Sequence, residues 1–227
     1  MRQSFVDSEE NPEAMKKTKR LEPLIPKELE TQSFTASIDD NYISKCRIFQ
    51  ETIDFTTEEA LHVDKVVFEN VNFLETVWPR SEFVDVVFLN CDLSNADLSR
   101  TVFHRTEFHN SKLLGTNFAE AGIRHTLFED CIMNYATFGF SLCNTVSYIS
   151  SSLRFADFYQ MELKTSEFRK CDINDINFTE TSLKGIDLST NSFESIQVSI
   201  EKLQGCKVSP DQAIAFARQM GMIVEHN

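Results

Sequence analysis

The stretch from Cys91 to Arg100, CDLSNADLSR, contains two copies of one five-residue phrase, and this period decides the fold. An α-helix repeats about every 3.6 residues and a flat strand every two, so a period of five fits neither element. Every fifth residue from Val63 to Leu203 is apolar, at all 29 positions, in a chain that is 41% apolar overall. Thirteen of the 20 phenylalanines lie on this register. The pattern predicts a repeat architecture rather than a set of separate helices and strands.

The position two residues before each large apolar residue completes the repeat. Between Val66 and Ile196 it is small or β-branched at 25 of 27 places, the exceptions being Met161 and Asn191. Each pentapeptide therefore directs one large and one small side chain inward and three outward. A chain that turns a corner every five residues closes a four-sided coil in about twenty. Coils stacked at the strand spacing of about 4.8 Å would bury a core that no single coil could bury alone, so we predict an all-β solenoid.

The N-terminal part of the chain departs from the repeat. Glu58 places a carboxylate at an inward position, which predicts a bulge or short loop near residues 56–62. Residues 1–33 are polar and contain three prolines, so we expect a flexible N-terminal arm. The repeat region is then expected over residues 34–205, regular from about residue 63, with a helix and tail over residues 206–227.

The C-terminal part carries the signals of an α-helix. Ser209 is a favourable N-cap, Pro210 takes the first helical position, and Gln212 follows three residues after the cap. We expect the helix to end at Gly221. Its apolar side chains exceed the needs of one coil end, so we expect them to close the last coil and to join two subunits about a twofold axis. The candidate dimer interface consists of Ile214, Phe216, Ala217, Met220, Met222 and Val224.

Composition narrows the classes of function. A net charge of −13, from 35 acidic and 22 basic residues, argues against direct binding of nucleic acid or membrane and favours basic protein partners. Neither a secretory signal nor an apolar run of membrane-spanning length is evident, so a cytoplasmic location is expected. His104 and His125, with Glu82 nearby, could suggest a metal site, but surface histidines beside arginines usually bind no metal. We expect a protein that is not an enzyme and needs no cofactor.

The phrases CDLSN, ADLSR, TNFAE, ADFYQ and IDLST resemble the repeat of the pentapeptide-repeat family, often written A-(D/N)-L-x-x. The likeness covers about 140 residues without an insertion. It implies a right-handed quadrilateral β-helix, with the handedness taken from the family alone.

The C-terminal run LQGCKVSPDQAIAFARQMGMIV narrows the resemblance. It is similar to the end of the Qnr-type quinolone-resistance branch of that family, in particular its Gram-positive chromosomal members. The resemblance implies a homodimer that binds the type II topoisomerases DNA gyrase and topoisomerase IV, protects them from fluoroquinolones and imitates duplex DNA. Protection by loops that interrupt the coil cannot be carried over, because this sequence has no such interruption between Val63 and Leu203.

The charges of the repeat agree with DNA mimicry in part. Residues 63–203 contain 20 acidic residues, nearly three per coil, and duplex DNA carries one charge per about 1.7 Å of axis. The same span also contains 12 basic residues, several of them on the side through Phe83 and Phe103. A uniform polyanion is therefore excluded, and we expect acidic sides and one basic side. The candidate topoisomerase-binding residues are Glu69, Glu107, Glu129, Asp130, Asp187, Asp92 and Asp172.

Two alternatives to this function stay open. The fold hosts many functions, so the chain could be an interaction scaffold for an unrelated protein partner. It could also provide self-protection against another topoisomerase poison. The residues alone do not decide between protection and inhibition of the topoisomerase.

Overall fold

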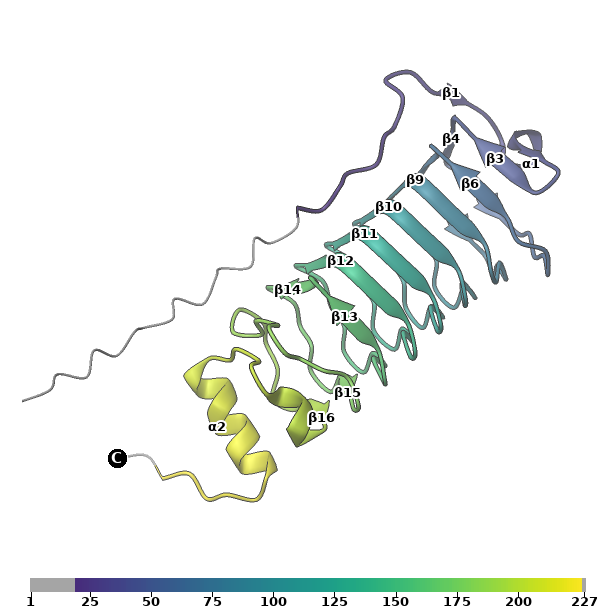
Figure 1. Ribbon diagram of the computed structural model, residues 1–227. Coiled ribbons are helices and arrows are strands. Elements are labelled where there is room, and N and C mark those ends of the chain that lie inside the picture. The colour runs from purple at the N-terminus through teal and green to yellow at the C-terminus, as the bar shows by residue number, and fades with distance from the viewer. Residues whose placement is uncertain (1–18, 226–227) are drawn as a thin grey trace, which may run out of the picture.

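The computed structural model describes residues 19–225, which form a four-sided parallel β-solenoid of about eight turns with a short helix at its C-terminal end (Figure 1). Residues pair with those twenty positions later, as Phe103 does with Phe83 and with Ile123. This confirms the predicted all-β solenoid and its twenty-residue coil. The most regular part consists of four long parallel strands, β9 (Glu82–Leu89), β10 (Val102–His109), β11 (Gly122–Glu129) and β12 (Leu142–Ile149).

The short strands are β1 (Glu30–Thr31), β2 (Ile38–Asp39), β3 (Tyr42–Ser44), β4 (Cys46–Phe49), β5 (Thr52–Ile53), β6 (His62–Asp64), β7 (Val67–Glu69), β8 (Asn72–Phe73), β13 (Glu162–Lys164), β14 (Glu167–Arg169), β15 (Asn177–Phe178) and β16 (Gln197–Val198). Short strands such as β6, β7, β13 and β14 continue the sides formed by the long strands, and the remaining sides pair mostly through isolated bridges at an offset of twenty residues. The helical elements are α1 (Phe34–Ser37), a 3-10 helix (Ile200–Leu203) and α2 (Pro210–Gln219).

Columns of aromatic rings fill the core. In one column the rings of Phe68, Phe88, Phe108 and Phe128 are nearly parallel, with centroids 5.0, 4.5 and 4.9 Å apart. The side chains of the column are completely buried. The twenty-residue spacing of these inward phenylalanines produces the column, and Tyr148 continues it at 5.2 Å.

Side chains at the small inward position fit the limited space and also accept hydrogen bonds from backbone N–H groups. The hydroxyl of Ser111 accepts a hydrogen bond of 3.0 Å from the backbone N–H of Cys91 in the coil before it. Asn191, an exception to the small-residue rule, has the same role, because its amide oxygen accepts from the N–H of Cys171 at 2.9 Å. A buried amide left without a partner would be costly, which favours Ser, Thr or Asn at several of these positions.

Each corner of the solenoid is a single residue in the left-handed backbone region. Positive φ angles recur at every fifth residue from Lys65 to Gly185, and only Gly115 and Gly185 among these corners are glycine. The conformation costs a non-glycine residue about 1–2 kcal/mol. The corner amides bond to the next coil, as in the 2.8 Å bond from Arg100 N–H to the Ala119 carbonyl. These hydrogen bonds between coils stabilise the corners, so a chain with only six glycines can form a corner every five residues.

The first coil is irregular where the sequence predicted it. Residues 54–61 contain no strand, and Glu58 is exposed rather than inward. Phe34 of α1 is buried in this region, with its ring stacked on Trp78 at 5.6 Å and an interplanar angle of 7°. The indole N–H of Trp78 donates to the Phe55 carbonyl at 2.7 Å. An aromatic residue from the cap therefore closes the end of a column that Glu58 would have left open.

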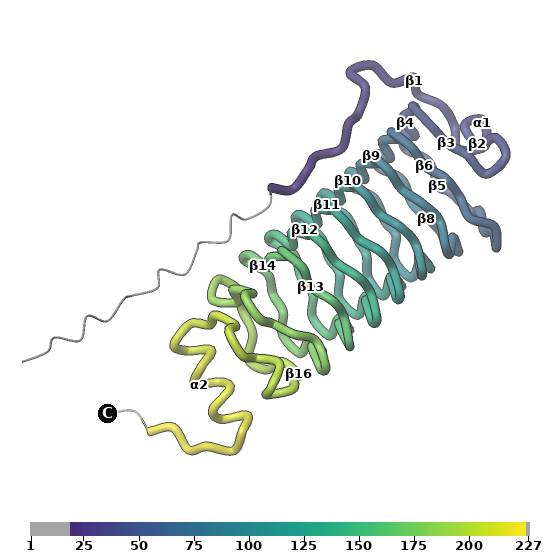
Figure 2. The backbone as a smooth tube through the Cα atoms, in the orientation of Figure 1, coloured from purple at the N-terminus to yellow at the C-terminus, as the bar shows by residue number. Residues whose placement is uncertain are grey.

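Residues 19–33 of the expected arm pack against the solenoid, whereas residues 1–18 lie outside the described part of the chain. This segment runs alongside the solenoid (Figure 2), and β1 pairs with β4. The backbone N–H of Leu24 donates to Asp85 at 2.9 Å, and Arg20 donates to Glu107 at 2.6 Å. The reason is electrostatic, because carboxylates on the solenoid provide acceptors for a polar arm.

The C-terminal helix forms as predicted. The Ser209 hydroxyl accepts from the N–H of Gln212, whose side chain accepts from the N–H of Ser209, so the capping box is complete. The buried Gln212 amide also donates to the Leu188 carbonyl at 2.9 Å. Phe216 is 9% exposed and packs edge-on against Phe193 at 5.7 Å, so α2 closes the last coil. Within residues 19–225, no helix is long and apolar enough to cross a bilayer.

Replacing Arg20 with alanine tests whether an ion pair holds the arm. The contact with Glu107 is largely buried, with 19% and 15% of the two side chains exposed. Its loss should weaken docking by about 1 kcal/mol and raise the detached fraction about fivefold. Hydrogen exchange at the Leu24 amide, which is bonded to Asp85, should quicken by the same factor. The exposed neighbour Lys19 provides a control, since Lys19→Ala should change nothing. Equal exchange in Arg20→Ala and the wild type would contradict this role.

Candidate acidic interaction surface

Outward side chains of successive coils form rows, because the register places each beside the residue twenty positions later. The seven carboxylates predicted to bind a topoisomerase, here called the acidic surface, occupy two adjacent sides of the solenoid. Asp92 and Asp172 lie on the side whose inward column includes Leu93 and Ile173. The other five lie on the side of the Phe88 column and are Glu69, Glu107, Glu129, Asp130 and Asp187.

A histidine bridges two carboxylates of this surface. His109 Nε2 lies 3.0 Å from Glu107 Oε2, and its Nδ1 lies 3.2 Å from Glu129 Oε2. The hydrogen bond to Glu107 raises the pKa of His109, and burial opposes this shift less strongly. Burial of Glu107 disfavours its charge, but the bonds from His109 and Arg20 outweigh this effect and lower the pKa of that carboxyl. Negative charge here is therefore partly neutralised within the chain, most fully when His109 is protonated.

Three more of the predicted carboxylates have basic partners in the chain. Asp130 is exposed and forms no ion pair with any residue from 19 to 225. Exposed ion pairs contribute little stability, but they reduce the negative potential that a basic partner would meet. The surface is thus less negative than its carboxylates alone suggest. The three carboxylates with basic partners are Glu69, paired with Arg47, Asp92, paired with Lys112 at 3.5 Å, and Asp172, paired with Arg154 at 3.1 Å.

The aspartate of the repeat phrase has a structural role that sequence reasoning missed. Asp92 Oδ1 accepts hydrogen bonds from the backbone N–H of Ser94 at 3.1 Å and from its hydroxyl at 2.6 Å. Asp187 accepts the same two bonds from Ser189, at 3.0 and 2.6 Å. Burial of Asp92 is outweighed by the bonds from Ser94, so the pKa of this carboxyl is lowered. The spacing Asp-Leu-Ser is the sequence signal for this turn.

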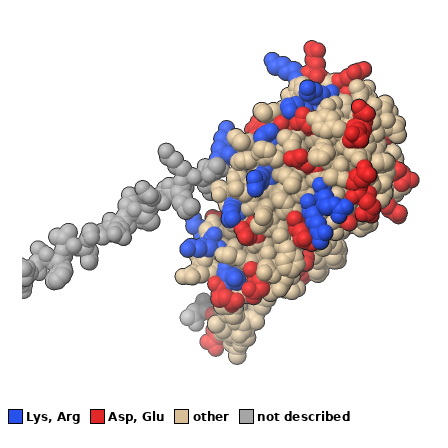
Figure 3. Space-filling view, turned by 45° about the vertical axis from the view of Figure 1, so that its right-hand side comes forward, with Lys and Arg blue, Asp and Glu red and all other residues tan. Residues whose placement is uncertain are grey.

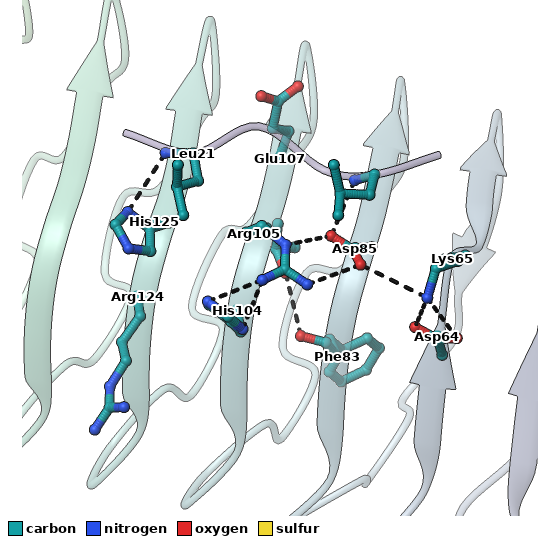
Figure 4. A network of polar contacts seen from close by, with 12 residues as sticks. Leu21, Asp64, Lys65, Phe83, Asp85, His104, Arg105, Glu107, Arg124 and His125 are labelled. Atoms are coloured by element: carbon teal, nitrogen blue, oxygen red, sulfur yellow. Dashed lines mark hydrogen bonds and ion pairs between the residues drawn. The ribbon is translucent and has the colours of Figure 1, made fainter. Parts of the chain in front are cut away.

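Part of the positive charge on the expected basic side is also paired with a carboxylate of the chain. Figure 4 shows the arm crossing this side above Arg105, whose guanidinium donates to both oxygens of Asp85 at 2.5 and 2.9 Å. Lys65 lies 3.8 Å from the same carboxylate, which is 1% exposed. Burial raises the pKa of Asp85, but the bonds from Arg105 and Leu24 outweigh burial and lower it. In the space-filling view, the visible face carries both basic and acidic side chains, with the acidic ones gathered mostly toward its right-hand edge (Figure 3).

The two histidines considered for a metal site lie together on this side. The rings of His104 and His125 are 5.8 Å apart, and His125 Nδ1 accepts a 3.4 Å bond from the Leu21 N–H. Burial and the nearby Arg105 lower the pKa of both histidines. Over the described range 19–225, no group of three His, Cys, Asp or Glu residues is placed to hold a metal ion.

The residues expected at a dimer interface divide into two groups. Phe216 is buried on the inner face of α2, and Ile214, Ala217 and Val224 are half-buried. Met220 and Met222 are exposed. The sequence interpretation omitted two more apolar residues at this end, Ile200 and Ile223, which are 64% and 92% exposed. The apolar end of the molecule is therefore larger than predicted.

Comparison with known proteins shows which family the chain is similar to. A family model described as "Pentapeptide repeat region" matches residues 61–138 and 101–178. The uncharacterized protein YisX of Bacillus subtilis (strain 168) is 37% identical over 120 residues, which are 52% of this chain and 57% of the relative. The chain thus matches little more than half of that relative's length.

Solved structures that the chain matches include QnrB1 after trypsin treatment, described as a plasmid-mediated fluoroquinolone resistance protein. It is 16% identical, with 81% of this chain and 99% of that chain covered and a TM-score of 0.37. Another is HetL from Nostoc sp. strain PCC 7120, described as a pentapeptide repeat protein involved in heterocyst differentiation regulation. It is 12% identical, with 73% and 86% of the two chains covered and a TM-score of 0.27.

The family model covers more than half of the sequence, in the region where the twenty-residue register is most regular. The chain belongs to the pentapeptide-repeat family.

Proposed function

We propose that this protein is a cytoplasmic, non-catalytic binder of the type II topoisomerases DNA gyrase and topoisomerase IV. It occupies the surface on these enzymes that binds duplex DNA, and it protects them from fluoroquinolones. The observation that carries the proposal is the run from Leu203 to Val224, which resembles the Qnr-type module and ends an uninterrupted rod. The acidic surface on two adjacent sides of that rod supports it.

The dimensions are compatible with a DNA-binding groove. About eight turns at about 4.8 Å per turn make a rod of about 40 Å. Two copies joined end to end would span about 80 Å, the length of roughly 23 base pairs at about 3.4 Å each. A dimer is therefore long enough to replace a DNA segment across a twofold enzyme.

On docking, basic residues of the enzyme would replace the basic partners that carboxylates of the acidic surface already have within the chain. Glu107 is already paired with Arg20, and Asp172 with Arg154. A basic groove on the enzyme would have to displace these partners, so each exchange contributes little affinity. Charge complementarity would then chiefly guide association and orientation.

Asp130→Lys tests the acidic surface without disturbing the fold. Asp130 is an exposed corner residue with φ of 53°, and Lys170 occupies a corner of the same row with φ of 55°, so lysine is tolerated there. Gyrase supercoiling would be followed in the presence of a fluoroquinolone. We expect the wild type to preserve supercoiling and the variant to need about three- to tenfold more protein for the same effect.

Thr165→Lys is the matched control, because Thr165 is an exposed left-handed corner on the basic side, with φ of 52°. It should protect as well as the wild type. Equal potency of Asp130→Lys would remove this row from the docking surface. A wild type without effect at micromolar concentration, with or without the drug, would favour the alternative of a scaffold with another partner.

The same proposal requires a dimer formed through the apolar C-terminal end. Ile223, Met222 and Ile200 are large apolar residues exposed there, and a second copy of the chain would cover them in a twofold contact. Phe216 contributes indirectly, because it is buried against Phe193 and supports α2.

Ile223→Asp should convert the dimer into monomers, as measured by analytical ultracentrifugation. Ile223 is 92% exposed, so the carboxylate disturbs no contact within one subunit but would be buried in the dimer, where an unpaired charge is unfavourable. Leu74→Asp, at an apolar position that is 46% exposed near the other end, should leave the mass unchanged. A dimer that persists in Ile223→Asp would exclude this end as the interface.

A further inference from the structure

Four aromatic side chains gather on the side of the solenoid whose inward column includes Phe138 and Phe158. The rings of Tyr135 and Phe155 stack at 5.1 Å with an interplanar angle of 6°, and those of Phe140 and Tyr159 meet edge-on at 5.5 Å. Tyr135, Phe140 and Phe155 are 57%, 55% and 44% exposed. We call these four residues the aromatic patch.

The backbone gives no reason for aromatic residues at these positions. Tyr135, Phe140 and Phe155 are corners, with φ of 61°, 61° and 57°, and bulky side chains are rare in this left-handed region. In the row of Tyr135 the preceding coils have Asn95 and Gly115, which suit the conformation better. Three unfavourable aromatic corners within two successive coils indicate selection for something other than folding.

Carboxylates surround the patch. Asp157 Oδ1 accepts the backbone N–H of Tyr159 at 3.1 Å, which fixes a carboxylate beside the rings. Glu120 and Glu180 lie at corners in the row of Phe140, where Glu120 pairs with Arg100 at 3.1 Å and Glu180 with Lys202 at 3.6 Å. Large exposed apolar groups beside the Asp157 carboxylate and a rim of ion pairs fit a protein surface that offers apolar side chains together with arginine or lysine. Cationic side chains also pack favourably on aromatic faces.

The patch is continuous with the acidic surface. Arg154 pairs with Asp172 of that surface at 3.1 Å, and its guanidinium lies 5.8 Å from the ring centre of Phe155. Tyr135 and Phe155 stand at the corner between the two sides. One partner could therefore contact both areas at once.

We propose that the aromatic patch is the centre of the contact with the topoisomerase, where it receives an apolar segment that bears arginine or lysine. This inference rests on the proposed function. Tyrosine and arginine dominate the energetics of many interfaces, whereas exposed charges at the rim contribute little. Because the acidic surface is largely compensated by cations of the same chain, affinity requires a contact of this kind.

The test is the double variant Tyr135→Asn, Phe155→Asn. Asparagine suits a left-handed corner, as Asn95 does in the same row, so the melting temperature should be unchanged or higher. Binding to purified gyrase without DNA, measured by titration calorimetry, should weaken at least tenfold. Tyr42→Asn removes an aromatic residue that is 46% exposed at the first coil and should bind within twofold of the wild type.

The outcomes separate the two proposals. If the wild type binds gyrase and the folded double variant binds equally well, the patch is not the contact, while the proposed function stands. If Tyr42→Asn weakens binding as much as the double variant, the effect is not specific and the inference is also overturned. If the wild type does not bind gyrase, the proposed function fails and this inference fails with it.

Discussion

The parallel backbone ladder between coils is the constraint on which the rest of the structure depends. Because each residue lies beside the one twenty positions later, every inward side chain must pack against the inward side chains of the coils before and after it. Flat rings meet this demand, with Phe88 and Phe108 only 4.5 Å apart and 1° from parallel. The same ladder bonds the corner amides, which keeps non-glycine residues in an otherwise unfavourable conformation. Core and corners are therefore one cooperative arrangement.

Much of this arrangement could be predicted from the sequence, because it is periodic. The coil length, the Phe88 column, the irregular segment around Glu58 and the capping box at Ser209 all follow from local spacing. The arm could not be predicted, because the bond from Arg20 to Glu107 joins residues 87 positions apart and repeats nowhere. The role of Phe34 could not be predicted for the same reason. Phe34 fills the inward space that Glu58 leaves, and the two residues come together only at the folded end of the solenoid.

The candidate site was predictable as a set of positions but not as a distribution of charge. Sequence spacing places the seven carboxylates on two adjacent sides, whereas the ion pairs of Glu69, Glu107 and Asp172 depend on side-chain geometry. A duplex presents phosphates with mobile counterions, while this rod carries its counterions covalently. Recognition by charge alone would be weak under these conditions, and exposed aromatic corners offer the desolvated contact that charge does not.

The stacked column is tested most directly by the unfolding free energy of Phe108→Ala, measured in urea. Phe108 is fully buried between Phe88 and Phe128, and removal of such a side chain from a tightly packed core typically costs about 3–5 kcal/mol. A loss in that range, with the β-sheet spectrum retained, is the predicted result. A loss below about 1 kcal/mol would mean that the column does not hold the coils in register.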